Sequence, residues 1–147
     1  MFYKWKTIKN FIFLNLLSYF IEKMRNDKKN IIVDKSFEFA LQIIQFTEKL
    51  SESKKFHLSN QLFKSGTSIG ANIKEAQNAE SKKDFIHKMK IAAKEADESE
   101  YWIELMILLN YQAKELLSKC REIQLILSKI ISTSKKGEPT FSNSQIN

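Results

Sequence analysis

The sequence predicts an all-α protein, and specifically an antiparallel up-down four-helix bundle. The chain of 147 residues has only three glycines and one proline, and its apolar residues recur along stretches with few turn signals. A β-sandwich or barrel needs a turn about every ten residues, so those classes are disfavoured. A chain of this length forms one domain with a substantial core. We expect the bundle to span residues 31–134, followed by a disordered polar tail over 135–147.

The first helix is expected over residues 34–53, with Asp34 as its N-cap. At 100° per residue, its apolar side chains fall into two stripes rather than one. The first stripe is Val33, Phe37, Ala40, Leu41 and Ile44, and the second is Phe39, Ile43, Phe46 and Leu50. A surface helix needs a single stripe somewhat over 100° wide. We therefore expect this helix to be buried twice, with the second stripe forming an interface between copies of the chain.

Three more helices are expected, over residues 58–79, 82–110 and 113–134. Gly66 and Gly70 lie four residues apart inside the second of the four helices, where they allow a neighbouring backbone to approach closely. Ser81 and Asp84 resemble a capping box that opens the third helix. Short connections between helices of this length are typical of an antiparallel bundle. The predicted inner stripes of these three helices are Leu58, Leu62, Ser65, Ile69, Asn72, Ile73 and Ala76, then Phe85, Met89, Ala92, Ala96, Ser99, Ile103 and Met106, then Leu116, Leu117, Ile123, Leu127, Ile130 and Ile131.

Residues 61–103 contain three short motifs: S-x-T-S-I-x-x-N-I-x-E-A over 65–76, K-K-D-F over 82–85 and E-A-x-E-x-x-Y-W over 95–102. Through this combination the chain resembles the four-helix bundle proteins encoded in intervening sequences of bacterial 23S ribosomal RNA genes. The resemblance covers about residues 31–134. That family is similar to the accessory variability protein of diversity-generating retroelements, which implies a ring-shaped homopentamer and, for the retroelement relative, a nucleic-acid-binding surface. The resemblance transfers the fold more securely than the function.

The formal net charge of +7 is unevenly distributed: residues 1–30 carry a net +5, and residues 31–147 only +2. The total charge therefore does not by itself argue for nucleic-acid binding. One local group does, because Lys83, His87, Lys90 and Lys94 project within about 60° of one another on the third helix. These four residues, which we call the basic ridge, are the candidate site for RNA or DNA. The alternative is that they are a solvated surface of a structural or protein–protein interaction module.

The sequence has no phosphate loop, nucleotide fingerprint or nucleophile elbow, so we expect no catalytic residues and no cofactor. The two histidines are His57 and His87, and Asp84-x-x-His87 is a single, incomplete match to a di-iron motif. We therefore expect no metal site. Glu75, Glu95 and Glu100 could mimic a carboxylate cluster, but no cleft is predicted around them. Cys120, the only cysteine, reads as a small packing residue in a cytoplasmic protein.

Residues 1–23 begin with lysines and contain an apolar run over residues 11–21. No small-residue cleavage site follows the run, and it is shorter than the about 20 residues that span a bilayer. We expect Met24 to be the true start and residues 1–23 to be upstream sequence or a flexible extension. An interfacial membrane-seeking helix is the alternative.

Overall fold

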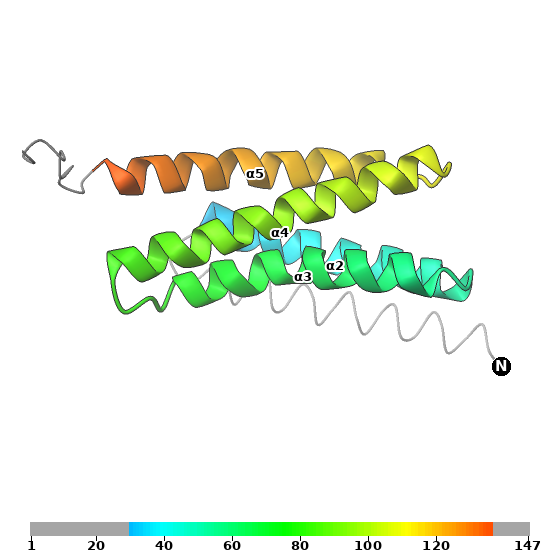
Figure 1. Cartoon of the computed structure of the whole chain (residues 1–147), viewed down its shortest axis with the longest axis horizontal. Helices are drawn as coiled ribbons and strands as arrows, with labels where there is room; N and C mark the ends of the chain where they lie inside the picture. The colour runs from blue at the N-terminus through cyan, green and yellow to red at the C-terminus, as the bar shows by residue number, and fades with distance from the viewer. Residues whose placement is uncertain (1–29, 137–147) are drawn as a thin grey trace, which may run out of the picture.

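The computed structural model describes residues 30–136, which form four α-helices. These are α2 (Ile31–Glu52), α3 (Phe56–Ala76), α4 (Lys82–Leu108) and α5 (Lys114–Lys135). The turns that join them lie at alternating ends of the molecule (Figure 1). The predicted all-α bundle is therefore confirmed. The predicted extension over 1–23 lies outside the described residues. The predicted tail over 135–147 begins too early, because α5 continues to Lys135, and the part from residue 137 onward lies outside the described residues.

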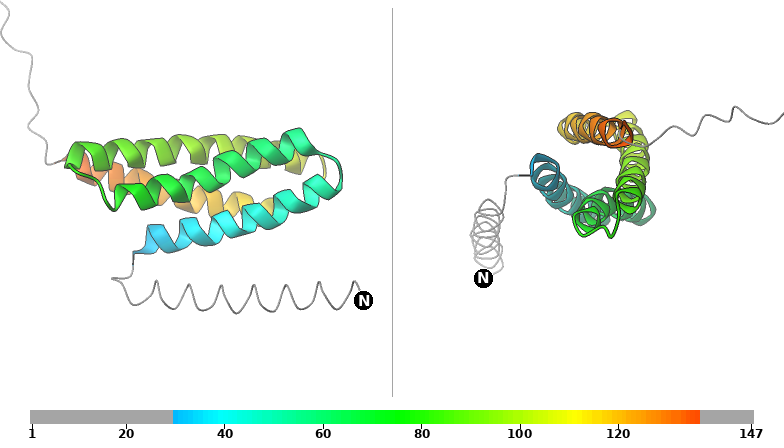
Figure 2. Two further views of the ribbon diagram at one scale, coloured as in Figure 1. Left: turned by 90° about the horizontal axis from the view of Figure 1, so that it is seen from below. Right: turned by 90° about the vertical axis from the view of Figure 1, so that its left-hand side faces the viewer.

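Contacts between consecutive helices run in opposite sequence order, as an antiparallel bundle requires. Between α3 and α4, Ser65 meets Ser99 while Glu75 meets Lys88. Seen end-on, the helices follow one another in chain order around an arc, with α2 and α5 at its two ends (Figure 2). Two ion pairs bridge those ends, Lys35 to Glu122 at 2.8 Å and Lys119 to Glu38 at 2.7 Å. The bundle is thus closed on that side partly by charged groups.

The N-terminal ends of two helices test the capping predictions. Ser81 was expected to cap α4, and its hydroxyl accepts a bond of 3.1 Å from the amide of Asp84. The carboxylate of Asp84 in turn accepts from the amide of Glu80 at 3.3 Å, one residue earlier than in a standard capping box. The prediction for Asp34 is wrong, because α2 begins at Ile31 after Asn30. Asp34 lies in the first turn, where a negative charge stabilises the helix dipole.

Two helices end in left-handed residues that are not glycine, which explains how so few glycines suffice. Lys54 has a φ of 60° and Asn110 a φ of 66°. In each case the next amide bonds back to the helix, Lys55 to the carbonyl of Leu50 and Tyr111 to that of Met106. This is the hydrogen-bonding pattern of a Schellman C-cap. The two turns at this end of the bundle therefore share one geometry.

The core contains the inner stripes predicted for α3, α4 and α5, and most of their residues are fully buried. Leu58, Phe85, Leu117, Ile130 and Ile131 are only partly buried and pack against its edge. Cys120, predicted to be a packing residue, is completely buried.

The assignment of the two stripes on α2 is wrong. Phe39, Ile43 and Leu50 are at most 1% exposed and lie in the core of the chain itself. Phe46 packs against the same core, with its ring edge-to-face on Tyr111 at 6.5 Å between centroids. These four residues are therefore not available as an interface between copies.

The second stripe lies in the core because two small polar residues, Ser36 and Thr47, extend it toward α3. Ser36 and Thr47 are buried, and each hydroxyl donates to a carbonyl of α2 itself, of Val33 at 3.0 Å and of Ile43 at 2.8 Å. Both residues are polar, but their small size lets α3 approach α2. Val33, Phe37, Ala40, Leu41 and Ile44, which we call the α2 outer stripe, are instead half-buried.

The two glycines of α3 lie where α2 and α3 come closest. A Cβ on Gly66 would lie 2.7 Å from Cγ1 of Ile43, and one on Gly70 would lie 3.4 Å from the carbonyl oxygen of Ser36. The predicted close approach is confirmed, and Gly66 is the position at which it demands glycine.

The predicted polar residues of the α3 inner stripe also find partners. The hydroxyl of Ser99 donates to that of Ser65 at 3.0 Å in the core, and Asn72 donates to the carbonyl of Ser68 at 2.9 Å. Over residues 30–136, every buried side-chain nitrogen or oxygen has a hydrogen-bond partner. These groups therefore have a structural role.

Candidate nucleic-acid interface

The basic ridge lies on one uninterrupted helix, α4, and all four of its side chains are exposed. Lys83, His87, Lys90 and Lys94 follow one another at i, i+4, i+7 and i+11, which spans about 16 Å along the helix. The core-facing residues of α4, such as Met89 and Ala92, lie on the other side. The structure thus brings the four predicted residues onto one outward surface.

The ridge lysines differ from Lys88, a basic neighbour on α4, in their ion pairing. Lys88 is paired with Glu75 of α3, and this pairing raises the pKa of the lysine through a hydrogen bond and charge attraction. Among the described residues, Lys83, Lys90 and Lys94 make no ion pair. Like charges at i, i+4 repel mildly, so an anionic partner along the ridge would relieve that repulsion.

The charge of α4 changes sign immediately after the ridge. Residues 95–104 include five acidic side chains and no basic one. Tyr101 is exposed in this acidic stretch, and the indole nitrogen of Trp102 donates to the carboxylate of Glu98 at 3.3 Å. The basic surface on α4 is therefore short, extending over residues 82–94 and matching only a few phosphates.

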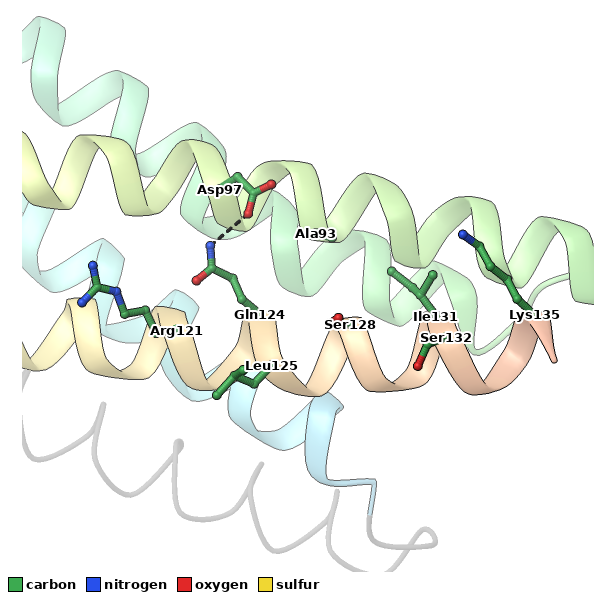
Figure 3. A pocket seen from close by; sticks show the side chains of 9 residues that line it. All are labelled: Ala93, Asp97, Arg121, Gln124, Leu125, Ser128, Ile131, Ser132 and Lys135. Atoms are coloured by element: carbon green, nitrogen blue, oxygen red, sulfur yellow. Dashed lines mark hydrogen bonds between the residues drawn. The ribbon is translucent and has the colours of Figure 1, made fainter.

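An open groove lies between α4 and α5, and Figure 3 shows the residues that line it. Two of its polar residues, Arg121 and Gln124, donate hydrogen bonds to carboxylates of α4. Arg121 donates to Glu100 at 2.6 Å and to Glu104 at 2.8 Å, while Gln124 donates to Asp97 at 2.9 Å. Arg121 and then Gln124 hold the pKa of Glu100 below its usual value. We interpret this network as a contact between helices, not as a ligand site.

Of the three carboxylates that could have mimicked a catalytic cluster, Glu75 and Glu100 belong to separate contacts. Glu75 pairs with Lys88 and Glu100 with Arg121, so each joins two helices. Asp84 belongs to the cap of α4, and His87 is exposed on the basic ridge. Within residues 30–136, no three His, Cys, Asp or Glu side chains are grouped so that they could hold a metal ion.

Cys120 is not placed to act as a nucleophile. Its thiol is fully buried and donates to the carbonyl of Ala96 at 3.3 Å. Burial, with the negative charges of Glu100 and Asp97, raises the pKa of the thiol to about 12. A thiol with this pKa is protonated at neutral pH and reacts slowly.

Sequence reasoning missed a second surface, an open groove on the outer side of α2 and α3. Ile44, Glu48 and Glu52 of α2 and Phe63 of α3 are among the residues that line it. The only sequence signal was Phe63, a large apolar residue outside the predicted inner stripe of its helix. A groove formed by two helices cannot be located from the periodicity of either one.

The described residues thus form an antiparallel four-helix bundle. The chain belongs to the 23S rRNA-intervening sequence protein family, whose model matches residues 28–132. It is also similar to a protein with unknown function from the S23 ribosomal protein family of Bacteroides thetaiotaomicron VPI-5482, solved at 1.70 Å resolution. The two chains are 46% identical, the match covers 69% of this chain and 98% of that one, and the TM-score is 0.67. Among curated proteins, none matches significantly.

The family resemblance expected from the three motifs is thereby confirmed. No helix of the described part is long and apolar enough to cross a membrane.

Proposed function

We propose that this protein is a non-enzymatic, self-associating bundle of the cytoplasm that binds the sugar–phosphate backbone of RNA or DNA through its basic ridge. The observation that carries the proposal is the ridge itself. Its four side chains are exposed on one face of α4, and its lysines are not paired within residues 30–136. Lys83 and Lys90 are about 10 Å apart along the helix and Lys90 and Lys94 about 6 Å, so each lysine can meet a separate phosphate.

Binding by one chain alone would be weak, because the ridge is short and the acidic stretch of α4 limits it. Self-association would repeat the ridge and raise the effective affinity through multivalency. The α2 outer stripe supports self-association, since its five apolar residues are only half-buried. The number of copies rests on the family resemblance alone, which implies five.

The test is the change of Lys83, Lys90 and Lys94 together to Glu. We expect at least about a tenfold loss of affinity for a short RNA at low salt, and a plot of log affinity against log salt that is shallower by about 2–3. Filter binding over a salt series measures both. Circular dichroism verifies that the variant remains helical.

A matched control reverses the same number of charges elsewhere. Lys49, Lys64 and Lys114 are exposed on three other helices, and their joint change to Glu should leave most of the affinity intact. If the two triple variants lose affinity equally, net charge and not the ridge governs binding.

The alternative function is a structural or protein–protein interaction module without nucleic-acid binding. The observation that favours it is the acidic stretch over residues 95–104, which repels phosphates directly beside the ridge. If the unmodified protein shows no salt-dependent RNA or DNA binding, this alternative replaces the first proposal.

A further inference from the structure

The face of α4 that carries the basic ridge continues beyond it to an exposed aromatic side chain. Tyr101 lies seven residues after Lys94 on the same uninterrupted helix. This spacing places it about 20° from Lys94 around the helix axis and about 10 Å farther along it. Tyr101 is 55% exposed. The lysines of the ridge and the tyrosine ring therefore share one outward surface, with the ring at its C-terminal end.

The ring of Tyr101 is supported by its neighbour Trp102. The two rings meet edge to face, with 5.2 Å between their centroids and 72° between their planes. The indole of Trp102 packs against the core, and its nitrogen donates to the carboxylate of Glu98 at 3.3 Å. Tyr101 thus rests against a side chain that two contacts hold in place. Because the ring is already supported, a ligand that stacks on it has less side-chain motion to restrict.

The charges around Tyr101 oppose a phosphate there but not a nucleobase. Residues 95–104 include five acidic side chains. Two of them, Glu100 and Glu104, form ion pairs with Arg121 of α5, which offsets part of their charge. The remaining carboxylates repel phosphates, whereas a base is neutral and its amino group can donate to a carboxylate. A bound strand is therefore expected to keep its phosphates on the ridge and to present a base at Tyr101.

We propose that the nucleic acid bound by the basic ridge is single-stranded, with a phosphate at Lys94 and an adjacent unpaired base stacked on Tyr101. The inference rests on the proposed function and specifies which form of nucleic acid the ridge takes. In a duplex the bases are paired and stacked on one another, so no base is free to cover the ring. Stacking on an aromatic side chain tolerates any sequence, because every base has a π-face.

The test compares the unmodified full-length protein with Tyr101→Ala on a short mixed-sequence RNA, on the DNA of the same sequence and on the blunt duplex of that DNA. One stacked base contributes roughly 5- to 150-fold in affinity. We therefore expect Tyr101→Ala to bind the single strands at least about fivefold more weakly and the duplex as before, which also shows that the variant is folded. The RNA and DNA strands together show which sugar the site prefers.

Two further variants test whether the aromatic face of Tyr101 is responsible. Tyr101→Phe keeps that face and should bind the single strands as tightly as the unmodified protein. Phe63→Ala is the matched control, because Phe63 is also an exposed aromatic residue but belongs to α3 and lies outside the ridge. Its removal should leave the affinity for the single strands unchanged.

Two other measurements separate stacking from charge. An abasic single strand keeps its phosphates and lacks bases, so the unmodified protein and Tyr101→Ala should bind it equally well. The slope of log affinity against log salt should be the same for these two proteins on the RNA, because stacking on a neutral ring releases no counterions.

The proposal is overturned if Tyr101→Ala binds the single strands as tightly as the unmodified protein, or if it loses as much affinity for the duplex. It is also overturned if Tyr101→Phe is as weak as Tyr101→Ala, or if Phe63→Ala has the same effect. All of these results leave the proposed function standing, since the ridge still binds. Binding of neither strand nor duplex by the unmodified protein would instead overturn the proposed function, and this inference with it.

Discussion

At the scale of single residues, Cys120 links burial to the pH dependence of stability. The pKa of its thiol rises from 9.0 to about 12 on folding, so the folded chain keeps the proton where the unfolded chain loses it. The contribution of the thiol to stability is therefore complete below about pH 9 and declines as the pH rises toward 12. The slope is at most about 1.4 kcal/mol per pH unit.

We expect the stability difference between the unmodified protein and Cys120→Ala to shrink between pH 8 and pH 10.5. Urea unfolding of both proteins at the two pH values measures it, and the comparison cancels the titration of lysines and tyrosines. A difference that stays constant with pH would show that the thiol is not held in its neutral form.

At the scale of helices, the contact between α2 and α3 predicts opposite outcomes for two similar substitutions. Gly66→Ala would place a methyl group 2.7 Å from Ile43, which is fully buried and cannot move aside. We expect a loss of about 1–3 kcal/mol in the free energy of unfolding. Gly70→Ala meets only an ordinary contact at 3.4 Å and gains helix propensity, so it should raise stability by up to about 1 kcal/mol.

Thermal or urea unfolding of the two variants measures the contrast, and each serves as the control for the other. Equal effects would mean that backbone propensity, and not the packing of Ile43 against α3, dominates at both positions.

The contact between α2 and α3 also shows which parts of the fold could be predicted from the sequence. Apolar periodicity predicted four helices and the inner stripes of three of them, because each of those helices has one dominant apolar face. In α2 the two stripes are nearly equal, and the decision depends on Ser36 and Thr47, which are polar but small enough to be buried against α3. The periodicity of apolar residues reflects the polarity of side chains but not their size. It therefore led to the wrong stripe of α2 being placed in the core.

The surface features also differ in whether they could be predicted from the sequence. The basic ridge was predictable because its four residues lie on one continuous helix, whose geometry fixes their spacing. The groove with Phe63 depends on how α2 and α3 pack together and on which side chains they leave exposed. No pattern within one helix contains that information.

At the scale of the whole molecule, the buried core residues of the described part lie between Ile32 and Leu127. The family match also begins only at residue 28. We expect a chain beginning at Met24 to show the same helical content per described residue and a cooperative thermal transition. Circular dichroism of this chain beside the full-length protein checks the prediction, and a truncated chain that is insoluble or unfolded would show that the apolar run over 11–21 completes the core.

The proposed self-association would join the short ridge and the α2 outer stripe into one account. Its most direct test is the mass of the unmodified protein in solution by static light scattering at physiological salt. The account predicts a mass several times the 17.2 kDa of one chain, and five times that value if the family resemblance holds for the number of copies. A single species of 17.2 kDa at every concentration would contradict it.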